Sequence, residues 1–142
     1  MHGRTEVFAV ITDSGAVCLC RSDEADRYTF PGGEPQAGES LMDAIVRLVR
    51  DSTDMVVIGL PLELCHFVQY FYDLDTCSGW VSSRYFFSVR VTKTPDFFIG
   101  HKDASVFRLP LKRGEFPPMV RMVLDTYAPK NMKHPGNEPG GE

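Results

Sequence analysis

Residues 28–55 read YTFPGGEPQAGESLMDAIVRLVRDSTDM, and this stretch decides the fold. It begins as the end of a strand, passes through a glycine-rich loop and continues as an amphipathic helix. Pro31 restricts Phe30 to an extended conformation, and Gly32 and Gly33 let the backbone approach a ligand closely. The apolar residues that then recur at helical spacing are Leu41, Ala44, Ile45, Leu48 and Val49.

The start of this helix carries a capping signal. Glu39 and Ser40 stand where a cap is expected, and Asp43 follows Ser40 by three residues, an acidic variant of the capping box. We therefore predict a helix over residues 41–54. At about 100° per residue, Leu48, Asp51 and Ser52 project from one side of it.

The same stretch resembles the Nudix box, the family pattern G-x5-E-x7-R-E-U-x-E-E-x-G-U, in which U is apolar. The positions that match at the right spacing are Gly33, Glu39, Arg47, Val49 and Met55. The pattern is not kept at Leu48, Ser52 and Asp54, while Asp51 matches by charge alone. The resemblance implies an α/β protein, a Nudix-type α/β/α sandwich with a mixed sheet, over about residues 6–127.

In Nudix hydrolases the glutamates in the second half of the box hold catalytic divalent metals. By resemblance, Asp51 and a backbone carbonyl at Gly33 would bind Mg²⁺ or Mn²⁺, with substrate phosphate completing the shell. The alternative takes Asp51 as a solvated surface acid and the chain as having no metal of its own, because hard cations need several anionic oxygens. In the family the box arginine ties the helix to the loop, so Arg47 is expected to pair with Glu39.

Several departures resemble one branch of the family, the GDP-mannose mannosyl hydrolases. That branch also has leucine after the box arginine, as in Arg47-Leu48 here, and an aromatic strand similar to residues 69–73 followed by Ser78-Gly79. Carried over, the resemblance makes His101 the general base and makes Arg21 and Tyr85 the groups that stabilise the leaving diphosphate.

The residues expected to contact substrate are Gly32, Gly33, Arg47 and Tyr28. For each of these candidates an ordinary structural role stands beside the functional one: His101 and Arg21 as solvated side chains, and Tyr28 and Tyr85 as packing residues. Asp103 is an alternative late-loop acid.

Two functions follow from the resemblance. The first is a divergent hydrolase of a nucleoside diphosphate linked to another group, with a nucleotide sugar such as GDP-mannose favoured. The alternative is a catalytically inactive protein that binds nucleotides or regulates. A third reading, RNA bound through the aromatic side chains of Tyr70, Tyr72 and Trp80, is disfavoured by the net charge of −4. A homodimer is left open, since Nudix domains often dimerise.

Composition fits one globular domain, expected over residues 1–128, because 43% of the 142 residues are hydrophobic and 24% are charged. The tail over 129–142, rich in Pro, Gly and charge, is expected to be disordered. No apolar run has the length of a membrane span, and the N-terminus lacks a signal peptide's apolar core, so a cytoplasmic protein is expected. Cys18 and Cys20 are expected to be buried thiols; a metal site that includes His66 is the alternative.

The remaining elements follow from composition and turn signals. Strands are predicted at 6–12, 16–21, 28–30, 55–60, 64–73, 84–91 and 106–109, and a second helix at 119–127. Pro61 is expected to interrupt the chain between the fourth and fifth of these strands. Loops are predicted at 74–83 and 93–105.

Overall fold

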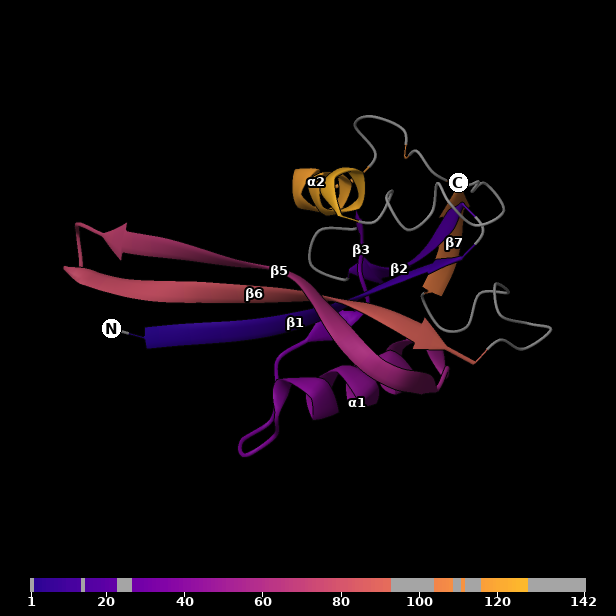
Figure 1. Ribbon diagram of the computed structural model, residues 1–142. Helices are drawn as coiled ribbons and strands as arrows, with labels where there is room; N and C mark the ends of the chain where they lie inside the picture. The colour runs from indigo at the N-terminus through magenta and orange to yellow at the C-terminus, as the bar shows by residue number, and fades with distance from the viewer. Residues whose placement is uncertain are drawn as a thin grey trace.

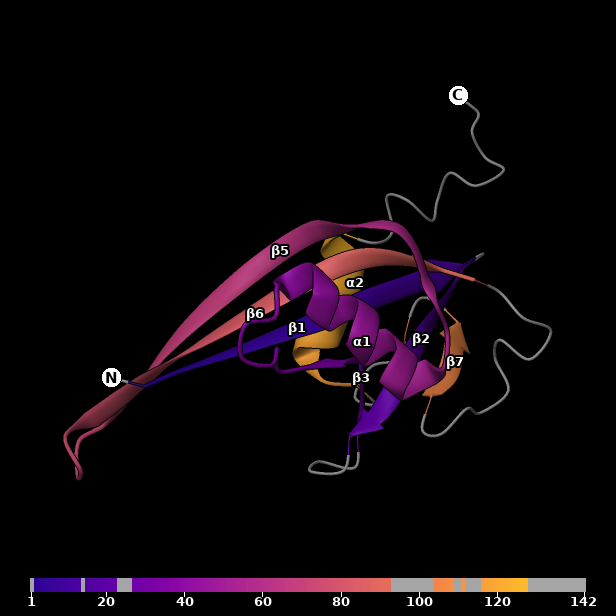
Figure 2. The same cartoon turned by 90° about the horizontal axis from the view of Figure 1, so that it is seen from below.

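A mixed sheet between two helices forms the body of the protein. The computed structural model describes residues 2–13, 15–22, 27–92, 104–108, 111 and 116–127. In chain order the elements are β1 (His2–Asp13), β2 (Ala16–Ser22), β3 (Arg27–Thr29), β4 (Gly32–Gly33), α1 (Leu41–Thr53), β5 (Val57–Asp73), β6 (Ser78–Val91), β7 (Ala104–Arg108) and α2 (Pro118–Thr126). Helices α1 and α2 cover opposite faces of the sheet (Figures 1 and 2), so the predicted α/β/α sandwich is confirmed.

The sheet in the described part of the chain has seven strands, in the order β3-β2-β1-β6-β5, with β4 paired to β1 and β7 paired to β2. Strand β1 is central because it pairs with three others: antiparallel with β2 and β4, and parallel with β6. One parallel ladder among antiparallel ones makes the sheet mixed, as expected.

Alternation along the strands divides the core into two layers. Val7, Ala9 and Ile11 of β1 pack with the apolar side of α1, whereas Val10 belongs to the layer under α2. Ile45 of α1 is fully buried in the first layer. Burial of both faces in the middle of β1 explains why its residues 7–11 are continuously apolar.

Helix α1 begins and ends as its sequence indicates. The Ser40 hydroxyl accepts a hydrogen bond of 3.0 Å from the backbone N–H of Asp43, so Ser40 is the N-cap that the capping signal predicts. The helix ends at Thr53, and Asp54 adopts a left-handed conformation with φ 62° and ψ 12°. In α2, Pro118 stands in the first turn, where its missing N–H costs no hydrogen bond.

Strands β5 and β6 differ from the expectation. Pro61 does not end a strand, because β5 runs from Val57 to Asp73 and absorbs the proline in an irregularity of its pairing with β6, between Ile58 and Leu62. The loop predicted at 74–83 is only a turn over 74–77, and β6 starts at Ser78. The resulting long hairpin projects from the body beside the start of β1 (Figure 1). We call residues 64–83 of this hairpin the arm.

Other predictions fall partly or wholly outside the described residues. These are the loop predicted at 93–105, with His101 and Asp103, and the tail at 129–142; of that loop only Ala104 and Ser105 are described, and they begin β7. The single-domain boundary at 128 stays a prediction. In the part of the chain that the structure covers, no helix is long and apolar enough to cross a membrane.

Candidate functional site

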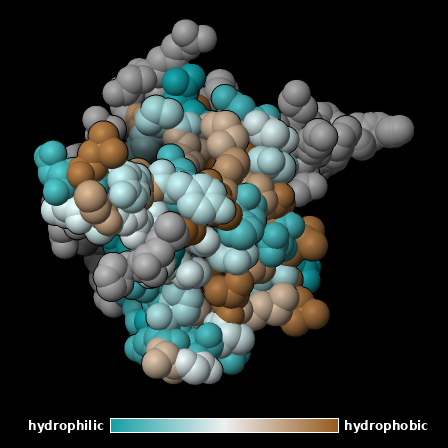
Figure 3. All heavy atoms as spheres, turned by 90° about the vertical axis from the view of Figure 1, so that its left-hand side faces the viewer, coloured by the Kyte–Doolittle hydropathy of each residue, from teal (hydrophilic) through white to brown (hydrophobic). Residues whose placement is uncertain are grey.

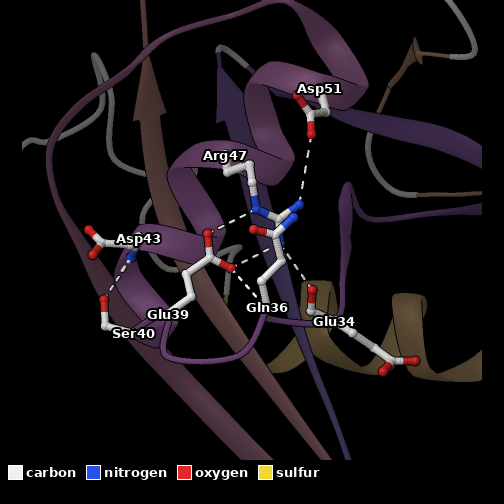
Figure 4. Close-up of polar contacts among 7 residues, drawn as sticks. All are labelled: Glu34, Gln36, Glu39, Ser40, Asp43, Arg47 and Asp51. Atoms are coloured by element: carbon white, nitrogen blue, oxygen red, sulfur yellow. Dashed lines mark hydrogen bonds and ion pairs between the residues drawn. The ribbon is translucent and has the colours of Figure 1, made fainter.

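Arg47 joins the glycine loop to α1 through its ion pair with Glu39, which we call the clasp. Its Nε donates to Glu39 Oε2 at 2.9 Å and its Nη2 donates to Glu39 Oε1 at 3.0 Å, so the pair is bidentate (Figure 4). Nη2 also donates to the backbone carbonyl of Glu34 at 3.1 Å, and Glu39 Oε1 accepts from the Gln36 N–H at 2.8 Å. The loop over residues 34–39 is thus held at both ends by one guanidinium group.

This clasp changes the acidity of its members. The hydrogen bond from Arg47, followed by that from the Gln36 N–H, lowers the pKa of Glu39 below its ordinary value of 4.5. The same hydrogen bond, which the Glu39 carboxylate accepts, raises the pKa of Arg47. Both side chains are therefore charged at neutral pH. Most of the hydrogen-bond donors of the Arg47 guanidinium already bind the loop, so few of them remain for the substrate contact expected of Arg47.

The two glycines of the loop lie against neighbours that a side chain would meet. A β-carbon added to Gly32 would stand 2.9 Å from the Phe8 Cα and would also collide with the backbone carbonyl of Val7. One added to Gly33 would stand 3.1 Å from Leu48 Cδ2. Glycine is therefore needed at Gly32 for the pairing of β4 with β1, and Leu48 covers the backbone of Gly33.

The side of α1 that the family uses for metals does not fit a resident divalent cation. Leu48 stands at one acidic position of the box and packs on Gly33, and Ser52 stands at another. Asp51 is 63% exposed, and its Oδ2 lies 3.8 Å from Nη1 of Arg47. Among the residues that the structure describes, no three His, Cys, Asp or Glu side chains gather as a metal site would require.

Asp54 explains one departure from the box at the level of the backbone. The pattern has glycine there, and the position takes φ 62° while its N–H donates to the Arg50 carbonyl at 2.8 Å. Glycine takes such a left-handed cap at the lowest cost, and Asp and Asn tolerate it better than most other residues. The helix end keeps its geometry without the glycine.

Tyr85 lies in one row across the sheet with the glycine loop. Gly33 pairs with Val7, Val7 pairs with Tyr85, and Tyr85 pairs with His66. Tyr85 packs against the α1 core layer, and its ring stacks on that of the exposed His66 with centroids 3.9 Å apart. Register between distant strands creates this His66–Tyr85 pair, so the sequence pattern did not assign His66 to the site.

Tyr28 and Arg21 lie across the sheet from that row. Tyr28 packs edge-on against Phe107, with ring centroids 4.7 Å apart, in the layer under α2. Arg21 is exposed and pairs with Tyr28 in the β2–β3 ladder. By alternation it shares the α2 face with Leu19. The structure therefore does not bring Tyr28 or Arg21 together with Tyr85, and the packing of Tyr28 favours its structural role.

A positively charged side chain that the motif did not indicate, that of Arg4, lies beside the loop. Nε of Arg4 is 3.0 Å from Glu34 Oε2, and its Nη2 is 3.5 Å from Glu6 Oε2. The loop therefore carries a carboxylate at Glu34 and faces a guanidinium that β1 supplies. Only the β1–β4 pairing reveals this arrangement.

The cysteines occupy ordinary packing positions. Cys18 is buried, and Cys20 packs against the same α1 core layer, so both point to one face as predicted. Burial raises the pKa of the Cys18 thiol to about 11. His66 stacks on Tyr85, which accounts for its ring without a thiol–metal site. None of the four cysteines forms a disulfide.

Comparison with known proteins identifies the fold. No protein-family model matches the chain, and no curated protein matches it. Among solved structures, it is similar to a NUDIX hydrolase from Nitrosomonas europaea, at 20% identity and TM-score 0.61 over 86% of each chain. It is also similar to a MutT protein from Methanosarcina mazei Go1, at 19% identity and TM-score 0.63 over 92% of this chain and 96% of that one.

A UDP-X diphosphatase is a third neighbour, at 18% identity and TM-score 0.65, over 92% of this chain and 65% of that chain. Architecture, element order and these similarities agree, so the chain has the Nudix fold. At these identities, the likeness extends to the fold and not to the chemistry. What the chain does has to be argued from its own residues.

Proposed function

We propose that this chain takes a nucleoside diphosphate linked to a second group, with a nucleotide sugar such as GDP-mannose favoured, and hydrolyses it as a divergent Nudix-type hydrolase. The observation that carries the proposal is the bidentate Arg47–Glu39 clasp, which holds the glycine loop against α1. Neighbours of the same fold include a UDP-X diphosphatase, which supports this ligand class. A cytoplasmic protein is part of this proposal, and the four cysteines, which form no disulfide, are in keeping with it.

The chain's own residues then have distinct tasks. The clasp fixes the loop so that its backbone can face a diphosphate. In this proposal Tyr85, which lies in the same row of the sheet as Gly33, donates a hydrogen bond from its phenol to an oxygen of the leaving diphosphate. His101 keeps the role of base as a proposal. Arg21, expected as a second stabiliser of the leaving group, is left out of it because its row of the sheet lies on the α2 face, opposite Tyr85. Because α1 does not offer a metal donor set, Mg²⁺ or Mn²⁺ belongs to this proposal only as a companion of the substrate's phosphates.

Binding without turnover is the second candidate. Leu48 favours it, because an apolar side chain packed on Gly33 replaces a carboxylate at the face that the family uses for metals. In this case the loop and the His66–Tyr85 pair would hold the ligand, and nothing would be released.

One experiment separates these functions. The purified chain is incubated with a panel of nucleotide sugars and dinucleoside diphosphates in Mg²⁺ or Mn²⁺, and released nucleotide and sugar are measured by chromatography. The hydrolase is supported if the wild type releases product and Tyr85→Phe lowers the rate of release on the order of 10²-fold. The control is Tyr72→Phe, which alters an exposed tyrosine on the arm. Absence of product throughout the panel rules the hydrolase out, and calorimetric binding of the same ligands then decides for or against the second candidate.

A further inference from the structure

The arm concentrates apolar surface that the body of the protein does not cover. Of the twelve large hydrophobic side chains found exposed in the described residues, nine lie on β5, on β6 or on the turn between them. On the arm they include Tyr70, 76% exposed, and Tyr72, 63% exposed. Figure 3 views the molecule from the side toward which the arm projects, and apolar residues reach the surface there. Such a concentration marks an interaction surface.

The exposed side chains gather on the edge strand. On the α1 face of the arm, β5 presents Val68, Tyr70 and Tyr72. The inner strand β6 offers small partners to the first two, Ser83 and Val81. Within the ranges that the structure describes, β6 is the only strand with which β5 pairs. The outer backbone groups of β5 therefore lie at the sheet edge, directly beside the exposed tyrosines.

This edge lacks the usual protection against strand pairing. Natural edge strands are blunted by charges, prolines or bulges. The irregularities of β5 all lie between Ile58 and Cys65, and from Cys65 to Asp73 it pairs with β6 without a shift. Residues 64–72 read LCHFVQYFY and contain no charged side chain. By contrast, the start of β1, on the other side of β6, carries Arg4 and Glu6.

We propose that a second copy of this chain docks on the arm, with the two β5 strands pairing antiparallel through residues 64–72. An uncharged edge meets no like charge when it faces itself. Antiparallel pairing of identical strands is closed by a two-fold axis, so it makes a dimer and does not propagate. The same pairing places Val68, Tyr70 and Tyr72 of both copies on one face of a continuous sheet, where the apolar side chains of the two edge strands lie side by side.

The test is the mass of the full chain in solution over a micromolar concentration series, by sedimentation or light scattering. The wild type is expected at twice the 15.9 kDa of the chain. Tyr70→Lys and Tyr72→Lys each put a charge on the uncharged face and are expected to weaken association by at least ~10-fold. Both positions are exposed, so neither change buries a charge in the monomer. The matched control is Met122→Lys, at an exposed apolar position on α2.

Hydrogen exchange supplies a readout of the strand edge itself. Amides in residues 66–72 of the wild type should exchange more slowly at high than at low protein concentration, and this difference should vanish in the lysine variants. A wild type that stays at the mass of one chain overturns the proposal. So does a dimer that survives both lysine changes, or one that Met122→Lys disrupts equally. Circular dichroism checks folding, and if Tyr70→Lys unfolds the chain, Tyr72→Lys decides.

Discussion

Leu48 lies over the backbone of Gly33, so close that a β-carbon on the glycine would stand 3.1 Å from Leu48 Cδ2. The contact joins the well-matched half of the box to the poorly matched half. It places a hydrocarbon where the family pattern has a carboxylate, beside the loop that faces the diphosphate in our proposal.

The first prediction concerns metal affinity at this side of α1. The wild type should show no saturable Mn²⁺ binding by calorimetry, because Asp51 supplies a single, solvated carboxylate. Leu48→Glu combined with Ser52→Glu restores two carboxylates beside it and should produce saturable binding. The control pair, Met42→Glu with Arg50→Gln, changes the net charge by the same two units at other exposed positions of the helix. Saturable binding of Mn²⁺ by the wild type would show that this side of α1 does accept a divalent cation.

A second prediction follows from the acidity of Glu39. Its pKa is lowered in the folded protein, chiefly by the hydrogen bond from Arg47, so the ionised form stabilises the fold. That stability is complete above the unfolded value of about 4.5 and is lost as the pH falls through the lower folded value. The urea concentration at which the wild type is half unfolded should therefore decrease as the pH is lowered below 4.5.

In Glu39→Gln the midpoint should depend less steeply on pH in that window, and at neutral pH it should lie below that of the wild type. Asp125→Asn removes an exposed carboxylate from α2 instead and serves as the control. Equal pH slopes for the wild type and Glu39→Gln would show that the clasp does not contribute to acid stability.

Local signals in the sequence predicted much of this part of the fold. The apolar spacing of α1, the cap at Ser40 and the pairing of Arg47 with Glu39 all depend on residues within about one loop of each other. Such short-range relations can be read from spacing. The structure shows each of them, and the mixed sheet between two helices is likewise as expected.

Long-range register could not be read in this way. The match of His66 to Tyr85, and of Gly33 to Val7, depends on how strands far apart in the chain align. Pro61 signals a break, but a bulge on an edge strand accommodates it. Residues 78–83 look like a loop because they are mostly small and polar. They form a strand because β5 pairs with all of them and β1 pairs with residues 80–83 on the other side.

A third prediction concerns thiol reactivity. Burial raises the pKa of Cys18 to about 11, and burial followed by the charge of Glu63 raises that of Cys65 to about 11. At pH 8 only about one in a thousand of such thiols is ionised. Cys77 is exposed in the turn at the tip of the arm. Iodoacetamide should therefore label Cys77 first and Cys18 last, as mapped by mass spectrometry of peptides.

Denaturant supplies the control for this prediction. In urea, Cys18 should become reactive as the fold is lost, and Cys77→Ser should remove the fastest labelling phase without affecting the others. Labelling of native Cys18 at the rate of Cys77 would mean that the α1 core layer opens readily, against the 2% exposure of that side chain.

The last prediction separates two adjacent glycines by what surrounds them. In Gly32→Ala the new methyl group meets backbone atoms of β1, 2.9 Å from the Phe8 Cα, and the β4–β1 pairing must shift to admit it. In Gly33→Ala it meets only the end of the Leu48 side chain, which can rotate away. Gly32→Ala should lower the free energy of unfolding by about 3 kcal/mol, the upper range for overpacking, and Gly33→Ala by about 1 kcal/mol or less.

Gly38→Ala provides the reference, because its φ of +79° strains an alanine while no atom lies within 4 Å of the new methyl group. Urea unfolding of the three variants measures the differences. Gly32→Ala should be the least stable, since backbone cannot yield as a leucine tip can. Equal losses at Gly32 and Gly33 would mean that β4 is not held against β1 as tightly as the pairing indicates. The glycine loop would then have to be positioned by the Arg47–Glu39 clasp alone.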